Sequence, residues 1–543
     1  MRSKTALPRR DRRWRWFAAG AVLALGAALA VPVLRAQSPA AQKTLPVFTV
    51  SKAGLTGDES ARLQNAFGLR QVVRNSAGVI RYVDPQRFLA LPTAALPAAE
   101  VKREEGERGK ALLERLDLEA LGRLRARDPK EALAATEKAL RTAGVLPEGG
   151  SPQVSNTRFE AVDVKGKRLA DQALDTTVSY RFTLAGLPLE GPGAKVRVAY
   201  GADGQVTQLL YAARRFAPAG QIAVLDPARG RQRCAEWAHT PGGSRSKVVA
   251  ADLAYYAPAV ALKVVRLEPS YRCRLVDESG ASSQVFFVPA AVNARQPALP
   301  LTQAVRKATA AALAVNPIEV GSEGTGPCSG LPWTGTNVGG FNSHMASGGV
   351  PVAFSWLDAN AWEDDWKEPS LAGHDSDWVD DVDMAYWQGH GSPTGFSLSG
   401  CSSIDDTSVG HADARWGNRD AEWMSLFTCL ILAKESGGQQ WWQRWGPTFQ
   451  GLHQINSFHT VSYHSAAHGG IYAEYLKKPY KVVSAWAQAS IDDQPQEVVW
   501  ASMGVIGPGG LVNYNDFFWN RGPVGPDVPA AQISGYWRLS GNS

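Results

Sequence analysis

Beyond residue 36 the sequence lacks any apolar run long enough to span a membrane. It also lacks an excess of basic charge once the N-terminal segment is set aside. The formal charge of the whole chain is +6, but residues 1–37 hold eight Lys and Arg and one Asp, so the remainder carries −1. We therefore expect no nucleic-acid partner, and no membrane contact outside the N-terminal segment.

Residues 1–37 are typical of a secretory signal peptide. Basic residues from Arg2 to Arg15 precede a continuous apolar stretch, Phe17–Leu34, and Ala36 supplies a small residue for cleavage. The apolar stretch is also about as long as the shortest bilayer-spanning helix, so an uncleaved anchor is the alternative. Either way we expect an exported protein, located in the periplasm, at the cell surface or outside the cell.

Cysteine is scarce in this chain, with five in 543 residues. In an exported protein an odd number suggests disulfides with one thiol left over. Cys234 and Cys273 share one strand-rich stretch, while Cys328 and Cys401 lie in loops rich in Gly and Ser. We predict that these two pairs are bridged and that Cys429 is free.

The composition changes near residue 317. Fifteen of the 18 tryptophans and eight of the nine histidines follow this point. Residues 38–316 carry a net charge of +13, and residues 317–543 carry −14. These are either two solvated surfaces or two halves that dock on each other through opposite potentials. We expect intramolecular contact between the basic N-terminal and the acidic C-terminal half.

Patterning of the N-terminal half predicts an α+β domain over 38–219, then a β-rich domain with a linker helix over 220–316. Leucines at helical spacing and Gly-rich turns between apolar runs carry this prediction. The predicted strands are 47–51, 177–184, 194–200 and 206–214; the predicted helices are 59–67, 110–125, 129–143 and 300–315.

One stretch of this half resembles known propeptides. Gly186–Gly191 and Gly204–Val206 fit the turns between strands in the PepSY and thermolysin-prosegment type of secreted-peptidase propeptide. The similarity covers about 40 residues, and any antiparallel meander needs such turns. It implies a prosegment that inhibits or chaperones a linked catalytic domain.

Two apolar strand candidates in the C-terminal half end in chemically active residues. The stretch "VDMAYWQGHGSP" (382–393) places His390 at its end, and "AEWMSLFTCLIL" (421–432) places Cys429 near its end, 39 residues later. One crossover connection fits in between, so the strands can be parallel neighbours with both residues at the same edge. A cysteine attacks as its thiolate, and a nearby imidazole supports this.

This order and spacing resembles the caspases, metacaspases, legumains and gingipains, which are clan CD cysteine peptidases. By that resemblance His390 is the catalytic histidine, Cys429 the nucleophile and the backbone N–H of Gly391 an oxyanion donor. The resemblance implies a three-layer α/β domain over 317–543 with a mostly parallel, caspase-like sheet. Predicted strands are 352–357, 382–387, 423–429, 452–458 and 498–505. The substrate would be a polypeptide, with no cofactor required.

Two residues depart from the family pattern. Thr428 stands where Ala, Ser or Gly is usual, and Leu430 where Gly, Arg or Glu is common. Bulky neighbours can narrow the site, so the alternative is an inactive exported binding protein. Such a protein would keep the fold and use a Trp-rich surface, including Trp441, Trp442 and Trp445, for a polymer or a protein partner.

Metal sites are a further hypothesis. Residues 358–383 hold ten acidic side chains in 26 residues, and clustered carboxylates suit Ca²⁺. The predicted ligands are Asp375, Asp377, Asp380 and Asp381, although no EF-hand spacing is present; the alternative is a solvated acidic loop. His464 and His468 are spaced for one helix face, but the Glu of a His-Glu-x-x-His zinc motif is missing, which favours surface or capping histidines.

Overall fold

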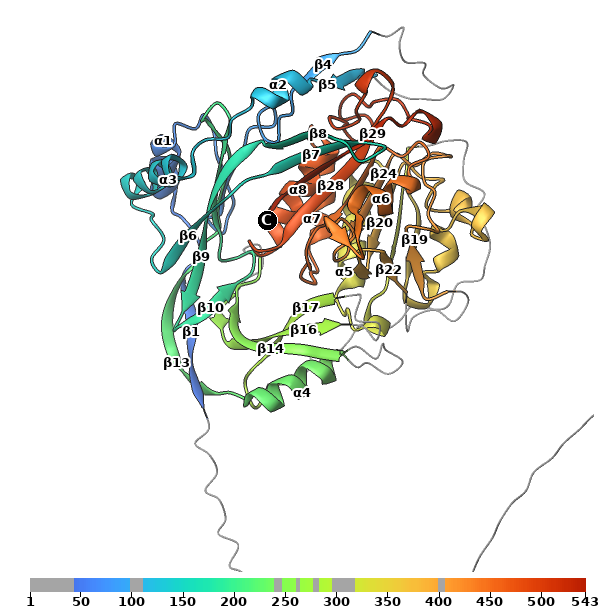
Figure 1. Cartoon of the computed structure of the whole chain (residues 1–543). Coiled ribbons are helices and arrows are strands. Elements are labelled where there is room, and N and C mark those ends of the chain that lie inside the picture. The colour runs from blue at the N-terminus through green and yellow to red at the C-terminus, as the bar shows by residue number, and fades with distance from the viewer. Residues whose placement is uncertain are drawn as a thin grey trace, which may run out of the picture. The chain divides into compact units, whose positions relative to one another are not determined.

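The computed structural model describes residues 43–97, 111–238, 247–259, 264–276, 283–294, 318–398 and 406–543 (Figure 1). Residues 42–543 form one compact unit of mixed α/β structure. No helix among the described residues is long and apolar enough to cross a membrane. The signal peptide, the predicted helix 300–315 and Cys401 lie outside the described residues.

A nine-stranded mixed sheet carries the two candidate catalytic strands. Its order is β19-β18-β20-β24-β27-β28-β29-β7-β8. The first five strands are parallel to their neighbours, and pairing is antiparallel from β28 onward. The strands are β18 (Val320–Gly324), β19 (Val352–Leu357), β20 (Met384–Gln388), β24 (Trp423–Phe427), β27 (Gln454–Phe458), β28 (Val499–Ile506), β29 (Gly535–Asn542), β7 (Arg158–Asp163) and β8 (Arg168–Ala173).

The parallel strands β18, β20, β24 and β27 are buried throughout, as strands covered on both faces must be, whereas the edge strand β19 is only partly buried. The five strands predicted for the C-terminal half are confirmed, and their observed ends differ from the predicted ones by no more than two residues. Helices α5 (Thr334–Ser347), α7 (His468–Leu476) and α8 (Val482–Asp493) pack together and supply Phe341, Tyr472 and Trp486 to the core.

Strands from the N-terminal half complete this sheet. β7 and β8 precede residue 317, yet β7 pairs with β29 from Gly535 to Ser540 (Figure 1). The sheet that carries the site is therefore built from both sides of residue 317.

A thirteen-stranded sheet holds most of the N-terminal half and runs into the C-terminal half. Its main path is β2-β3-β12-β11-β9-β10-β14-β16-β17-β21-β22-β23, with β6 pairing to β9. The strands are β2 (Val73–Arg74), β3 (Ile80–Val83), β6 (Gly150–Ser155), β9 (Asp175–Leu184), β10 (Leu187–Glu190), β11 (Val196–Gly201), β12 (Val206–Tyr211), β14 (Lys247–Tyr256), β16 (Pro269–Val276), β17 (Ser283–Pro289), β21 (His390–Ser392), β22 (Gly395–Ser397) and β23 (Ser408–Gly410).

Smaller elements flank these sheets. β1 (Thr44–Lys52) pairs with β13 (Arg215–Ala223) and β15 (Arg266–Leu267). The α-helices among the described residues of this half are α1 (Gly57–Ala66), α2 (Leu118–Arg123), α3 (Pro129–Ala143) and α4 (Pro227–Ala238). The predicted disulfide Cys234–Cys273 is present, with a Cα–Cα distance of 5.7 Å, and joins α4 to β16.

One predicted helix is wrong. Residues 114–116 of the stretch 110–125 form strand β5 (Glu114–Leu116), which pairs with β4 (Thr93–Ala95), and only the short α2 remains helical. Asp117 accepts a hydrogen bond from the Ala120 N–H and so starts α2 at Leu118. Tertiary pairing overrides the leucine pattern here.

Candidate functional site

The strand ends bring His390 and Cys429 to the same edge of the nine-stranded sheet. β20 and β24 are parallel neighbours, and Gln388 is in register with Phe427. His390 and Cys429 each follow that pair by two residues, so they occupy equivalent positions at the carboxyl end. This is the edge where open α/β sheets bind ligands.

A small cavity lies between the two side chains. His390 and Cys429 both line it, and its volume is about 20 Å³. The other lining residues are Leu331, Gln388, Gly389, Phe427, Ser462 and His464. Because a water molecule needs roughly 10–15 Å³ of such space, the cavity has room for about one water.

The His390 ring is held from the loop that follows β18. Its Nε2–H donates to the Ser329 carbonyl at 2.8 Å, and the side chain is buried. In a neutral imidazole that donates from Nε2, Nδ1 is the nitrogen that can accept a proton.

The Cys429 thiol is buried and protonated in this arrangement. Its Sγ lies 3.5 Å from Ser462 Oγ and accepts from the Ser462 N–H at 3.3 Å. Burial raises the pKa of the Cys429 thiol to about 11, which opposes thiolate formation. Cys429 is the free cysteine of the described chain, and Cys328 is disulfide-bonded while its predicted partner Cys401 lies outside the described residues.

The backbone after Cys429 is strained, since Leu430 has φ of +67°. A left-handed conformation at a non-glycine residue costs about 1–3 kcal/mol and often marks a functional site. This conformation turns the chain sharply after Cys429. Glycine, which is common at this position in the family that the sequence resembles, would adopt it without strain, whereas Leu430 does not.

Gly391 packs directly on the Cys429 peptide. A Cβ added to Gly391 would lie 2.8 Å from the Cys429 carbonyl oxygen and closer still to Thr428 Oγ1. Only glycine permits this approach. In addition, Gly391 pairs with Phe396 of β22 on one side and with Ser283 of β17 on the other.

The loop 459–467, between β27 and α7, closes the site and was missed by sequence reasoning. Ser462 contacts Cys429, and His464 accepts a hydrogen bond at Nε2 from the Trp333 N–H at 3.0 Å. Burial, with a smaller effect of His390, lowers the pKa of His464 to about 3. Trp333 stacks on the His464 ring at 5.4 Å and is 37% exposed beside the site.

His464 and His468 do not form a metal pair. His468 stacks on Phe427 at 4.3 Å in the core, and burial lowers its pKa to about 3. It is a core histidine, rather than the surface or capping residue that the sequence favours. Trp441 and Trp445 are likewise core residues, and Trp442 stacks on Tyr536 at 6.5 Å.

The four predicted calcium ligands divide between interior and surface. Asp375 and Asp380 are fully buried, and burial raises the pKa of Asp375 to about 8. Asp377 and Asp381 lie further out, near His374 and Arg419. Among the described residues no group of three or more His, Cys, Asp or Glu could hold a metal ion. Calcium binding stays a prediction.

The comparisons with known proteins attach no activity to this edge. Residues 322–541, which include His390, Gly391 and Cys429, match the family described as "Domain of unknown function (DUF6345)". No curated protein matches the sequence. Among solved structures the chain is similar to an uncharacterized protein from Eubacterium rectale ATCC 33656, at 9% identity and a TM-score of 0.24, over 47% of this chain and 86% of that chain.

Proposed function

We propose that this chain is an exported cysteine peptidase of the caspase–gingipain type that cleaves polypeptides. The observation that carries the proposal is the position of His390 and Cys429 at equivalent ends of neighbouring parallel strands, on one cavity. The five parallel strands β19-β18-β20-β24-β27 would be the caspase-like core, and the antiparallel strands an extension of it.

The chemistry follows from these residues. Nδ1 of His390 accepts the thiol proton, and the Cys429 sulfur attacks the substrate carbonyl carbon. The oxyanion accepts hydrogen bonds from the backbone N–H groups of Gly391 and Cys429. The tetrahedral intermediate expels the amine, which takes the proton from His390, and leaves a thioester. Water then attacks the thioester with His390 as base, which releases the acid and restores the thiol.

The described arrangement is a latent form. A thiol with a pKa of about 11 beside a cavity for about one water is not poised to attack, and movement of the loop over Cys429 would admit the substrate. Exposure to water would remove the burial that raises the thiol pKa.

The N-terminal half would act as prosegment or docking domain. Arg81 binds Asp492 at 2.9 Å, and buried Lys195, whose pKa burial lowers to about 7, donates from Nζ to the carbonyls of Ile491 and Gln494 at the end of α8. A cation at a helix C-terminus is favourable because the carbonyls there carry partial negative charge. These contacts support a role for the N-terminal half in stabilising the fold of the C-terminal half.

The second candidate is an inactive exported binding protein. The buried, protonated Cys429 favours it, since a structural cysteine behaves as a small apolar residue. If this candidate is correct, the Cys429→Ala variant should bind its partner as tightly as the unchanged protein does.

A labelling experiment separates the two. The purified chain is incubated with thiol-reactive peptide probes and a peptide library, and the labelled cysteine is mapped by mass spectrometry. We expect Cys429 to be labelled, Cys429→Ala to abolish hydrolysis, and His390→Gln to lower it at least about 100-fold. His344→Gln, on the exposed side of α5 next to Glu474, is the matched control and keeps full activity. Undiminished hydrolysis by Cys429→Ala would refute the proposal.

A further inference from the structure

Strand β17 of the N-terminal half binds both parts of the chain that close the site. Ser283 pairs with Gly391 in β21, so β17 holds the backbone that follows His390. Two residues along, Val285 pairs with Tyr463, and the Val285 carbonyl accepts the His464 N–H at 3.1 Å. One strand therefore bridges the hairpin β21–β22 and loop 459–467.

Loop 459–467 is called here the site loop. It contacts Cys429 through Ser462, the residue before the bridged Tyr463. Ser462 contacts the sulfur, and the next residue, Tyr463, is buried against β17. The Tyr463 ring lies 5.8 Å from the Phe287 ring of β17, and its hydroxyl donates to Glu497 at 2.8 Å. The same hydroxyl lies 3.3 Å from Glu190 of β10. The N-terminal half thus adds contacts to those that the site loop makes with its own half, such as Tyr463 N–H to Gln494 Oε1 at 2.7 Å and Asn337 to the Ser465 carbonyl at 2.9 Å.

The pairing of β17 is uneven. On its other edge β17 pairs with β16 along its whole length, from Ser283↔Val276 to Pro289↔Ser270. Toward the site its backbone pairs only with Gly391 and Tyr463 among the described residues, beside the ring contact of Phe287 with Tyr463. The edge toward the site has fewer backbone pairs than the edge toward β16, so it is the edge expected to open first, with β17 staying paired to β16.

We propose that β17 is a latch that keeps the site latent, and that withdrawal of the β16–β17 hairpin releases the site loop and opens Cys429 to an extended polypeptide. This inference rests on the proposed function and names how that site is regulated. The freed edge of β21, at Gly391, is then open to an extended chain, which can pair there as β17 does.

Phe286 and Phe287 allow a matched test because adjacent residues of a strand point to opposite faces. Phe287 contacts Tyr463 on the site side, whereas Phe286 is buried on the other side with Cys234, Tyr271 and Cys273. Phe287→Ala should therefore loosen the latch, and Phe286→Ala should cost stability without loosening it.

The readout is alkylation of Cys429 by iodoacetamide in the folded full-length chain, followed by mass spectrometry of the Cys429 peptide. We expect Phe287→Ala to raise the alkylation rate about tenfold over the unchanged protein, and Phe286→Ala to leave it unchanged. Circular dichroism confirms folding. If Phe287→Ala does not fold, Tyr463→Phe, which loses the bonds to Glu497 and Glu190, takes its place with the same expectation.

Equal alkylation rates in the folded site-side variant and the Phe286→Ala control would overturn the latch. Peptide hydrolysis is measured in the same samples and separates the two proposals. Faster alkylation without hydrolysis keeps the latch and refutes the peptidase, whereas hydrolysis with unchanged alkylation keeps the peptidase and refutes the latch.

Discussion

His453 is a buried histidine held between two carboxylates, ahead of β27 and on the edge of the sheet opposite Cys429. Its Nδ1 lies 2.5 Å from Asp516 and its Nε2 lies 2.9 Å from Asp527. Burial alone would lower the pKa of His453, but Asp516 and Asp527 outweigh it and raise the pKa to about 9. The protonated form is therefore part of the fold.

This predicts a loss of stability at high pH. A raised pKa in the folded state contributes stability that is complete below the unfolded value near 6.5 and disappears as the pH rises through about 9, at most about 3 kcal/mol. Urea unfolding at about pH 6 and about pH 9.5 should show this loss in the unchanged protein and a smaller one in His453→Gln. His374→Gln, an exposed control, should keep the full loss; equal pH dependence in all three would contradict the prediction.

The raised pKa of buried Asp375 predicts that stability falls between about pH 4 and about pH 8. Burial first, and Glu368 next, raise the pKa of Asp375 to about 8, so its contribution to stability is complete below about pH 4 and falls as the pH rises through 8. Asp375→Asn cannot ionise. We expect it to match the unchanged protein at about pH 3.5, below the unfolded pKa, and to be more stable at about pH 8, by a few kcal/mol at most.

Calcium is tested with the same two proteins. A cation on Asp375 and Asp380 would stabilise their ionised forms, so millimolar CaCl₂ should raise the melting temperature of the unchanged protein at about pH 8 and not that of Asp375→Asn. MgCl₂ at equal concentration is the control for ionic strength. No calcium-dependent shift in the unchanged protein would refute the calcium hypothesis.

Sequence patterns located His390 and Cys429 because both follow continuous apolar runs, and such runs end at sheet edges. They could not locate Ser462 and His464 over the sulfur. That loop is held by contacts with residues distant in the sequence, among them Val285, almost 180 residues earlier in the chain, and no local pattern records them.

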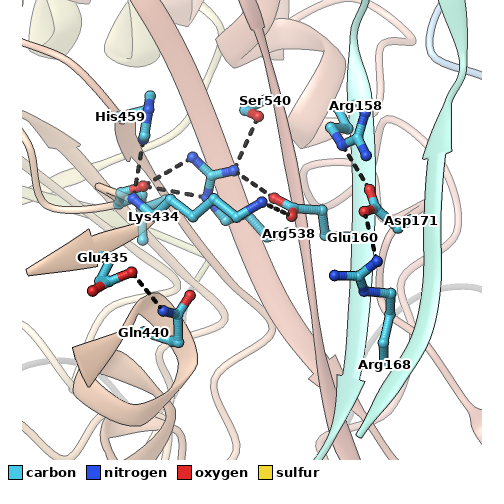
Figure 2. Close-up of polar contacts among 11 residues, drawn as sticks. Arg158, Glu160, Arg168, Asp171, Lys434, Glu435, Gln440, His459, Arg538 and Ser540 are labelled. Atoms are coloured by element: carbon cyan, nitrogen blue, oxygen red, sulfur yellow. Dashed lines mark hydrogen bonds and ion pairs between the residues drawn. The ribbon is translucent and has the colours of Figure 1, made fainter. Parts of the chain in front are cut away.

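Strand β7 is joined to the C-terminal half by a charged group as well as by backbone pairing. Figure 2 shows Arg538 of β29 between Ser540 and Glu160, with Lys434 on the same carboxylate. Arg538 is almost fully buried and Glu160 nearly so, whereas Asp171 of β8 binds Arg158 and Arg168, which are largely exposed.

Two neighbouring substitutions should therefore differ in cost. Glu160→Gln leaves the buried Arg538 without its counter-charge and should destabilise the protein by about 3 kcal/mol. Asp171→Asn breaks pairs that solvent screens and should cost less than about 1 kcal/mol. Urea denaturation measures both, and similar values for the two would contradict a structural role for the buried pair.

Elements with a clean apolar pattern were predictable, such as β19, β20 and α3. β18 was not predicted because "VGSEG" has no apolar pattern, although it is completely buried. Its polar groups have partners that only the fold supplies: Glu323 accepts from Trp366 Nε1 at 2.9 Å, and Ser322 bonds Ser355. The leucines of 112–124 gave the opposite error. Their helical spacing predicted one long helix, but residues 114–116 form strand β5 because they pair with β4.

The charge asymmetry between the halves is only part of what joins them. Arg81–Asp492 and the Lys195 contacts have the expected signs, with the basic partner in the N-terminal half. At β7 the sign is reversed, since Glu160 comes from the basic half and Arg538 and Lys434 from the acidic half. Backbone pairing of β7 with β29 adds a contact that salt does not screen.

These contacts predict that the halves stay together in high salt. The test is the full-length protein with a protease site inserted between residues 294 and 318, cleaved after folding and passed over a sizing column. A prosegment held by charge alone would dissociate as NaCl shortens the Debye length from about 10 Å at 0.1 M to about 3 Å at 1 M. Here, dissociation would expose the unpaired edge of β29, break the buried Arg538–Glu160 pair, which salt screens little, and remove Lys195 from the end of α8. We therefore expect the cleaved protein to elute as one species in both salts and residues 318–543 expressed alone to aggregate. Separation of the halves in high salt, with both still folded, would show that charge governs the interface.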